Sequence, residues 1–280
     1  MTKTVPTPDP GQKTSSEVLR FAVGGMITPR EGLVYYRAFL DYLADKIGRP
    51  VEYVDKESYA EINDLLREKK LDMAFVCSGP YVDGIEEFNL QPLAAPQAYG
   101  ESVYYSYVIV PADSPVENFA GLKGRKFAFT DPQSNTGTLV PTYMLAKMNE
   151  TPDSFFSSYE YTYAHDKSIK AVAMKLVDGA AVDSLIWEYA NRKDPVHTSK
   201  TKVIHKSPPY GIPPVAVRSA MDPELLSRIR EVFLNAHRDP EGREILAGMM
   251  IEKFGPVEDS RYDSVREMKT WLAKHKNPDQ

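Results

Sequence analysis

Short apolar runs alternate with amphipathic stretches along most of the chain, and the segments that connect them are short. In the first third of the chain, apolar runs at residues 18–25, 50–55 and 71–76 predict strands. Amphipathic patterns at residues 31–48 and after Ser58, a typical capping residue, predict the two helices between them. Because strands and helices joined this closely form right-handed crossovers, the pattern predicts a parallel sheet covered by helices.

The middle of the chain repeats this pattern after a long β-rich run at residues 102–112. The elements expected beyond it are a strand at 125–131, helices at 138–148 and 167–176, strands at 179–184 and 215–218, and helices at 223–238, 241–254 and 261–275. Two blocks joined by one strand outward and one proline-rich strand back predict an α/β protein with two lobes and a ligand cleft between them.

The two connecting strands set the expected domain boundaries. Residues 17–111 and 208–280 form the expected first lobe, and residues 112–207 form the second. Residues 1–16 are polar and rich in Thr and Pro, so we expect a flexible N-terminal tail. An alternative interpretation of these residues is the tether of an exported protein whose signal segment has been replaced by a starting Met.

Charge and cysteine content exclude several classes of protein. With 34 Lys and Arg against 39 Asp and Glu, the net charge of −5 gives no general attraction to nucleic acid or anionic lipid. The single cysteine excludes an intrachain disulfide and any multi-thiolate metal centre. No apolar run approaches the ~20 residues that span a bilayer. We therefore expect no nucleic-acid partner, no metal or other cofactor, and no direct membrane insertion.

A cluster of hydroxyls and free backbone N–H groups follows the strand that ends at Thr130. In the segment DPQSNTGTLVP, Ser134, Asn135, Thr136 and Gly137 lie at the start of a predicted helix. The first N–H groups of a helix lack partners within it and the helix dipole favours negative charge, so the segment suits an oxyanion that Gly137 lets approach the backbone. The alternative is an ordinary Ser or Thr cap. The segment lacks the Gly-Lys-Ser/Thr ending of a P-loop, so nucleotide hydrolysis is not supported.

A second candidate segment, CSGPYVDG, follows the strand that ends at Val76. Cys77 and Ser78 would face the cleft, and the Gly-Pro turn after them places Tyr81. A lone cysteine in apolar surroundings is usually an inert small hydrophobe. The alternatives are a soft ligand for a thiophilic solute and a catalytic nucleophile, which would need His165 beside it.

His165 precedes a predicted helix and Asp183 ends a predicted strand, so both can point into the cleft. In this position His165 would donate to an anion, and Asp183 would accept a proton from a protonated oxyanion or pair with an amine. Asp183 would then separate ligands by protonation, because it accepts from a partly protonated form and repels a fully ionised one. Both residues also suit simple helix caps, which is the alternative interpretation.

The order and spacing of these motifs resemble the periplasmic solute-binding proteins of phosphate, phosphite and phosphonate ABC transporters, over nearly all of residues 18–255. The matching stretches are YYRAFLDYLADKIGRPVEYV, SYAEINDLLREKKLDMAFVCSGPYV, SNTG, the His165 position, VDGAAVDS and SPPYGIPPVAVR. The resemblance implies the type II periplasmic-binding-protein fold, with a first lobe formed by both chain ends and closure around the ligand. The residues it implies as holders of a tetrahedral oxyanion are Ser134, Asn135, Thr136, His165, Asp183 and one of Tyr104 and Tyr105.

The same resemblance implies a non-catalytic protein of the periplasm. It would present phosphate, phosphite, a phosphonate or arsenate to an ABC-transporter permease or to the periplasmic domain of a sensor histidine kinase. One departure keeps a second ligand open: many transporter members lack a cysteine at the position of Cys77, whereas similar sensor-type proteins for arsenic oxyanions can use one. A thiol suits trivalent arsenic because both are soft. Arsenite bound by Cys77 and, more remotely, a Cys/His enzyme are the alternatives.

Overall fold

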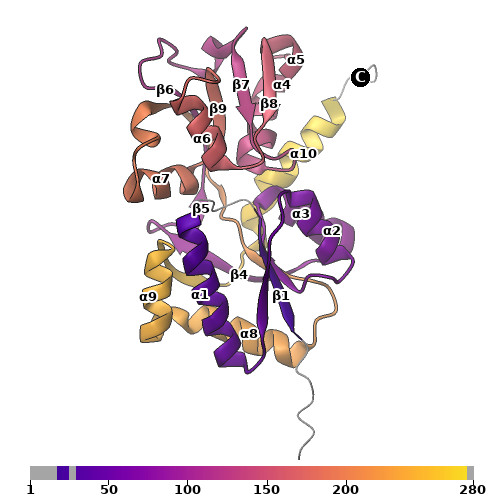
Figure 1. Cartoon of the computed structure of the whole chain (residues 1–280). Helices are drawn as coiled ribbons and strands as arrows, with labels where there is room; N and C mark the ends of the chain where they lie inside the picture. The colour runs from indigo at the N-terminus through magenta and orange to yellow at the C-terminus, as the bar shows by residue number, and fades with distance from the viewer. Residues whose placement is uncertain (1–17, 25–29, 276–280) are drawn as a thin grey trace, which may run out of the picture.

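Six strands form the sheet of the first lobe in a computed structural model that describes residues 18–24 and 30–275 (Figure 1). β1 pairs in parallel with both β2 and β3, as predicted, whereas β12 is antiparallel to β3 and β4. In their order across the sheet, the strands are β13 (Ile251–Gly255), β4 (Gln91–Ala98), β12 (Val215–Val217), β3 (Met73–Phe75), β1 (Leu19–Val23) and β2 (Val51–Val54).

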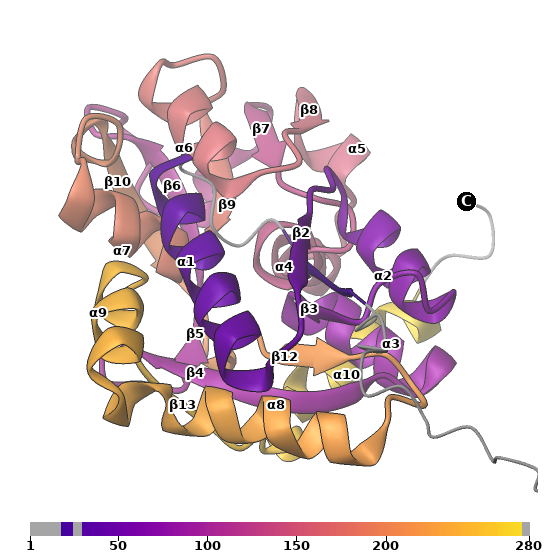
Figure 2. The ribbon, with the colours of Figure 1, turned by 60° about the horizontal axis from the view of Figure 1, so that its bottom comes forward.

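Helices bury both faces of this sheet, and each face has its own apolar core. Figure 2 shows α8 lying along β4, with α9 at the end of β13. The helices on this face are α1 (Arg30–Ile47), α8 (Pro223–Asn235) and α9 (Pro240–Gly248). The helices on the opposite face are α2 (Tyr59–Arg67), α3 (Ser78–Phe88) and α10 (Asp263–His275).

The second lobe is built around a five-stranded sheet. Its strands, in order, are β10 (Thr201–Lys206), β6 (Ser106–Pro111), β9 (Gly179–Asp183), β7 (Lys126–Phe129) and β8 (Ser158–Tyr161). The helices that cover it are α4 (Val140–Lys147), α5 (Pro152–Phe155), α6 (His165–Ala173) and α7 (Ser184–Lys193). The predicted α/β architecture with two lobes is therefore present.

Two short strands carry the chain between the lobes. β5 (Val103–Tyr104) and β11 (Tyr210–Gly211) form an antiparallel pair outside both sheets. The predicted β-rich run at 102–112 is thus divided at Tyr105, and its second half, β6, pairs with β9 and β10 of the second lobe. The expected boundary at residue 111 therefore lies at the wrong end of β6, because strand pairing and not local sequence decides which sheet a strand joins.

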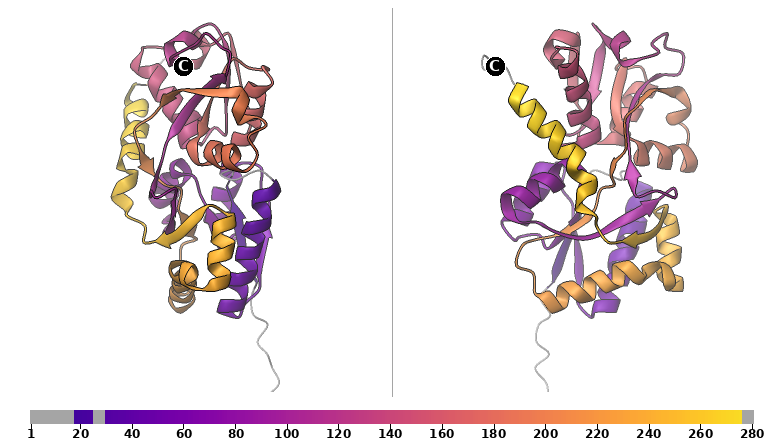
Figure 3. Two further views of the ribbon diagram at one scale, coloured as in Figure 1. Left: turned by 90° about the vertical axis from the view of Figure 1, so that its left-hand side faces the viewer. Right: turned by 180° about the vertical axis from the view of Figure 1, so that it is seen from behind.

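The C-terminal helix α10 touches both lobes (Figure 3). In the first lobe, Lys269 pairs with Asp83 of α3 at 2.7 Å. In the second lobe, the Trp271 ring contacts the Tyr143 ring of α4 edge-on, with 5.2 Å between the ring centroids. α10 was expected within the first lobe alone, but it packs across the junction of the two.

The prediction of one helix at 241–254 is wrong in its second half. α9 ends at Gly248, Met250 has a left-handed φ of 56°, and β13 follows from Ile251. The apolar residues of this segment pair with β4 at the edge of the sheet, which a helical spacing pattern does not reveal. The elements with no counterpart in the sequence prediction are α3, α5, α7, β4, β8 and β10.

The predicted N-terminal tail at 1–16 lies outside the described residues. Within residues 18–24 and 30–275, no helix has the length and apolar character needed to cross a membrane.

Candidate functional site

The segment after β7 begins with a π-helical turn, η2 (Asn135–Leu139), which leads into α4. Ser134 caps this turn, and its hydroxyl oxygen accepts the Gly137 N–H at 3.0 Å. The side chains of Ser134, Asn135 and Thr136 are fully buried. The cap and the predicted oxyanion site are thus the same turn, because the capping oxygen accepts a hydrogen bond while its own proton can still be donated.

Packing within the second lobe requires a glycine at position 137. A Cβ atom at this position would lie 1.7 Å from Thr130 Oγ1, so the glycine allows the turn to pack against the end of β7. The other expected role of Gly137, which is to let a ligand approach the backbone, stays a prediction.

Ser106 holds the turn beside Asp183. Ser106 on β6 pairs with Asp183 on β9, and the Ser106 hydroxyl donates to the Thr136 carbonyl at 2.6 Å. Asp183 also caps α7, since its Oδ1 accepts the Leu185 N–H at 2.7 Å. Its Oδ2 is buried and lacks a hydrogen-bond partner among the described residues, as do Thr136 Oγ1 and Asn135 Oδ1. These three oxygen atoms belong to one turn and to the strand end that packs on it.

Burial sets the protonation of Asp183. It raises the pKa of the carboxyl from 3.8 to about 7, although the N–H groups of Leu185 and Ile186 oppose the shift. Near neutral pH the carboxyl is therefore present in both forms. It can accept a proton from a ligand hydroxyl or donate one to a ligand oxygen.

His165 lies at the start of α6 and is a neutral donor. Its Nδ1 accepts the Asp183 N–H at 3.0 Å, so the proton of the neutral ring is on Nε2. Burial lowers the pKa of His165 to about 3, which keeps the ring uncharged. Nε2 lies 3.5 Å from the hydroxyl of Tyr59.

Tyr59, at the start of α2, contributes to the site from the first lobe and was missed in the sequence analysis. Its backbone N–H donates to Asp131 Oδ2 across the cleft at 3.0 Å, and its phenol is buried against His165. The available signal was its position directly after the predicted cap Ser58, because both lobes present helix starts to the cleft.

Cys77 of the first lobe contacts the η2 turn of the second lobe. The Asn135 N–H donates to Cys77 Sγ at 3.4 Å, and the Asn135 side-chain amide donates to the Tyr104 hydroxyl at 3.0 Å. Cys77 Sγ lies 3.7 Å from the same hydroxyl. Burial raises the pKa of the Cys77 thiol, so it remains protonated at neutral pH.

No hydrogen bond joins Cys77 to His165 in the described part of the chain. The thiol contacts Asn135 and Tyr104, whereas the imidazole contacts Tyr59 and Asp183. A thiol activated for attack needs a base within hydrogen-bond reach, so this geometry does not provide a nucleophile and base pair.

Three of the predicted residues have hydrogen-bond partners outside the turn. The Tyr81 phenol donates to Asp259 at 3.2 Å, and its ring packs against the Tyr262 ring. Tyr105 is half-buried and donates to Glu101 at 3.0 Å. The Ser78 hydroxyl donates to the carbonyl of Gly211 at 2.7 Å and so ties α3 to the crossing strand β11. Of the two predicted tyrosines, it is Tyr104 that lies at the turn.

We call the assembled group of side chains the cradle. None of its members is cationic, so an anion bound there would be held by neutral donors at the start of a helix and by one acid. Nor do the described residues contain a group of three or more His, Cys, Asp or Glu side chains placed to hold a metal ion. The cradle consists of Tyr59, Cys77, Tyr104, Ser134, Asn135, Thr136, His165 and Asp183.

A family profile and individual relatives agree on what this chain resembles. The sequence profile of the family described as ABC transporter, phosphonate, periplasmic substrate-binding protein matches residues 22–262. The phosphonates-binding periplasmic protein of Escherichia coli is 27% identical over 235 residues, which are 82% of this chain and 69% of that protein. The phosphate-import protein PhnD of Mycolicibacterium smegmatis is 28% identical over 213 residues, 71% of this chain and 65% of that protein.

Solved structures show the same architecture. A binding-protein component of an ABC phosphonate transporter from Pseudomonas aeruginosa has a TM-score of 0.86 at 25% identity and covers 92% of this chain and 87% of its own. PhnD1 from Prochlorococcus marinus, in complex with methylphosphonate, has a TM-score of 0.83 at 19% identity and covers 92% of this chain and 99% of its own. The two-lobe fold expected from the sequence is therefore confirmed.

Proposed function

Because the chain belongs to the family of periplasmic substrate-binding proteins of phosphonate ABC transporters, which is not a catalytic family, we propose that it captures one small tetrahedral oxyanion in the cradle. The ligand is of the phosphonate, phosphite, phosphate or arsenate class. Its relatives carry names for both phosphonate and phosphate, so the family alone does not choose between them. The proposal includes a periplasmic location and delivery of the ligand to an ABC-transporter permease.

One observation carries this proposal: Asn135 Oδ1, Thr136 Oγ1 and Asp183 Oδ2 are buried without protein partners among the described residues. A buried polar atom left without a hydrogen bond costs roughly 1–3 kcal/mol, so three within the cradle are unfavourable unless a ligand satisfies them. The hydroxyl of Thr136 donates to an oxyanion, whereas the amide and carboxylate oxygens accept from a protonated one. A partly protonated tetrahedral oxyanion meets both requirements.

Calorimetry and thermal unfolding with phosphate, phosphite, methylphosphonate, arsenate and arsenite test the proposal. A ligand that binds the folded protein alone stabilises it by ~2.7 kcal/mol at a concentration of 100 Kd. We expect at least one of the four tetrahedral anions to raise the melting temperature in this way. If none of the five compounds gave heat or a thermal shift, the proposed function would be wrong.

Cys77 supports a second candidate ligand, arsenite. Its thiol is buried within the cradle and contacts both Asn135 and Tyr104. Neutral arsenous acid can condense with a thiol: an S–As bond forms, one As–OH bond breaks, and the thiol proton leaves with that hydroxide as water. In this case the partner would be the periplasmic domain of a sensor histidine kinase.

The substitution Cys77→Ser separates the two candidates. It retains a hydrogen-bonding side chain of similar size but removes the soft sulfur atom. If arsenite is the ligand, calorimetry on the variant should show arsenite binding lost while methylphosphonate and phosphite binding persist. Unchanged arsenite binding, or none in the parent protein, would assign Cys77 to packing.

A further inference from the structure

An open groove lies between α7 of the second lobe and α9 of the first, which face each other in Figures 1 and 2. Its volume is about 360 Å³, which is within the range of small-molecule sites. Arg192 of α7 lines it from the second lobe, and Arg243 of α9 lines it from the first. The groove therefore receives one guanidinium group from each lobe.

The positive charge of the groove is not neutralised by the protein. Both arginines are exposed, and neither forms an ion pair with a carboxylate in the described part of the chain. The carboxylate that lines the groove is that of Glu252, whose Oε1 accepts the Gly100 N–H at 2.7 Å. In a chain with a net charge of −5, two unpaired guanidinium groups in one groove attract anions locally.

The position of Arg192 depends on the closed arrangement of the lobes. Its guanidinium lies 4.4 Å from the centre of the Tyr99 ring, and Tyr99 follows β4 of the first lobe. The ammonium of Lys193, the next residue, lies 5.9 Å from the centre of the Tyr35 ring on α1. The cations in the last turn of α7 thus contact aromatic rings of the first lobe, and these contacts hold Arg192 at the groove that Arg243 lines.

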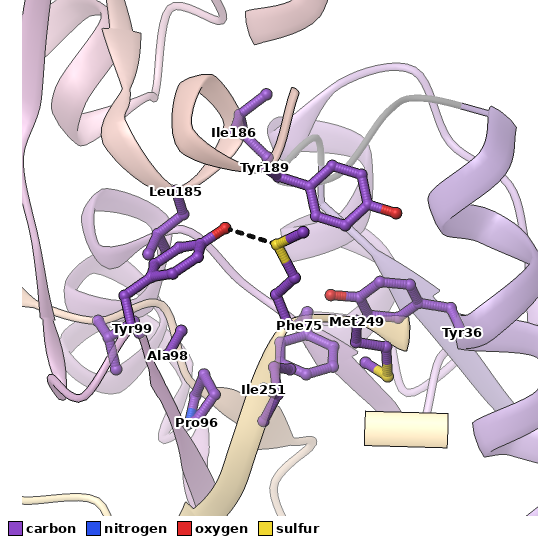
Figure 4. Close-up of a pocket in the computed structure, with 12 residues that line it drawn as sticks. Tyr36, Phe75, Pro96, Ala98, Tyr99, Leu185, Ile186, Tyr189, Met249 and Ile251 are labelled. Carbon is purple, nitrogen blue, oxygen red and sulfur yellow. Dashed lines mark hydrogen bonds between the residues drawn. The ribbon is translucent and has the colours of Figure 1, made fainter. Parts of the chain in front are cut away.

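A wall of side chains separates the groove from the cradle. The Tyr99 hydroxyl donates to Met250 Sδ at 3.2 Å, which is the dashed line in Figure 4. Tyr99, Met250 and Ile251 line both the groove and a small apolar chamber between the lobes. This chamber has a volume of about 30 Å³, and none of the side chains that line it carries a charge. Because an anion would lose its hydration in the chamber without an ionic partner, an anion in the groove stays outside the cradle.

We propose that the groove is a second anion site, which takes a small molecule with two anionic groups and joins the lobes from outside the cradle. A guanidinium binds phosphate or carboxylate through paired N–H donors, so Arg192 and Arg243 can each hold one anionic group. An anion held by both arginines favours the closed arrangement, because opening would move them apart. The site itself does not depend on the proposed function, whereas its effect on the cradle does.

Calorimetry of the full chain with inorganic pyrophosphate, at an ionic strength fixed with sodium chloride, tests the site. Pyrophosphate supplies two linked phosphate groups, and we expect the parent protein to bind it. Arg192→Gln and Arg243→Gln should each weaken this binding by about tenfold, because each removes charge-assisted hydrogen bonds to one phosphate group. An absence of heat, or binding of unchanged strength in either variant, would overturn the site.

Arg37→Gln is the matched control. Arg37 is exposed and its guanidinium lies 5.5 Å from the centre of the Tyr53 ring, but both residues belong to the first lobe. The control therefore removes the same charge and the same kind of ring contact away from the groove. It should bind pyrophosphate as the parent protein does. An equal loss in this variant would show that total charge, and not the groove, attracts the anion.

Binding in the groove should strengthen binding in the cradle. With saturating pyrophosphate, affinity for whichever of phosphite, phosphate, methylphosphonate and arsenate binds the cradle should rise about fivefold. By reciprocity, that anion should raise the affinity for pyrophosphate by the same factor. The gain should be lost in Arg243→Gln, which leaves the side chains of the cradle in place.

The outcomes separate this proposal from the proposed function. If pyrophosphate weakens binding of the tetrahedral anion, the two compete for the cradle and the groove is not a second site. If the affinity for the tetrahedral anion does not change, the groove does not join the lobes. If no tetrahedral anion binds but pyrophosphate binds through both arginines, the proposed function is wrong and the second site stands.

Discussion

Asp183 and His165 share one hydrogen bond, but burial shifts their pKa values in opposite directions. The pKa of Asp183 is raised from 3.8 to about 7, so from about pH 4 to 7 the folded protein binds more protons at this residue than the unfolded chain. Its contribution to stability is therefore present at acidic pH and lost as the pH rises. The pKa of His165 is lowered from 6.5 to about 3, so stability from this residue is lost as the pH falls below about 6.5.

Each residue therefore gives the free energy of unfolding a slope of ~1.4 kcal/mol per pH unit. In the parent protein the Asp183 slope and the His165 slope oppose each other between about pH 4 and 6.5. Asp183→Asn should leave the His165 slope, so the free energy of unfolding should rise with pH in this range. His165→Gln should leave the Asp183 slope, so it should fall. Urea unfolding of the ligand-free proteins at four pH values measures both, and identical slopes in the two variants would contradict the assignment.

The hydroxyls of Thr136 and Thr138 allow binding to be separated from stability. Thr136 Oγ1 lacks a protein partner among the described residues, whereas Thr138 Oγ1 donates to the Asp131 carbonyl at 2.8 Å. Thr136→Val should weaken binding of the oxyanion by roughly 1–3 kcal/mol without lowering the free energy of unfolding of the ligand-free protein. Thr138→Val should instead lower that free energy by about 1 kcal/mol. Calorimetry and urea unfolding check the two effects, and the reverse result would place the ligand elsewhere.

Helix α2 connects a local sequence signal to the site. Ser58 caps it, Glu61 completes the capping box, and Tyr59 follows with its N–H on Asp131 of the other lobe. Ser58→Ala should lower the free energy of unfolding by about 1 kcal/mol and weaken ligand binding, because the fraying helix start no longer holds Tyr59. Ser58→Asp, which keeps a capping oxygen, should restore both. Equal loss in the two variants would argue against the cap as the cause.

At the scale of the whole molecule, the closed arrangement of the two lobes brings the backbone of α3 against the backbone of the second lobe. A Cβ atom on Gly79 of α3 would lie 2.5 Å from the Gln133 carbonyl oxygen of the second lobe. Gly79→Ala should therefore hinder the closed arrangement without harming either lobe. We expect at least a tenfold loss of ligand affinity and a larger radius of gyration by X-ray scattering with ligand present.

Gly255→Ala is the matched control for closure, because a Cβ atom there would meet nothing within 4 Å. It should bind ligand as the parent protein does. A Gly79→Ala variant that closes and binds normally would show that the lobes can move apart by the small distance needed.

The sequence by itself determined the features that depend on neighbours along the chain. Apolar periodicity predicted the parallel core of the first lobe, and a hydroxyl-rich helix start predicted the turn at Ser134 and Thr136. Capping preferences predicted the role of Ser58. These signals are local because burial on one face and unpaired N–H groups at a helix start constrain residues within a few positions of each other.

Only the tertiary structure decided which side chains meet across the cleft. It placed Tyr59 in the cradle and removed Tyr81 and Tyr105, and it assigned β6 to the second sheet. The apolar chamber of Figure 4 is lined by side chains from both lobes that are far apart in the sequence. Such contacts depend on how two lobes pack and on long-range strand pairing, and no pattern within a single segment carries that information.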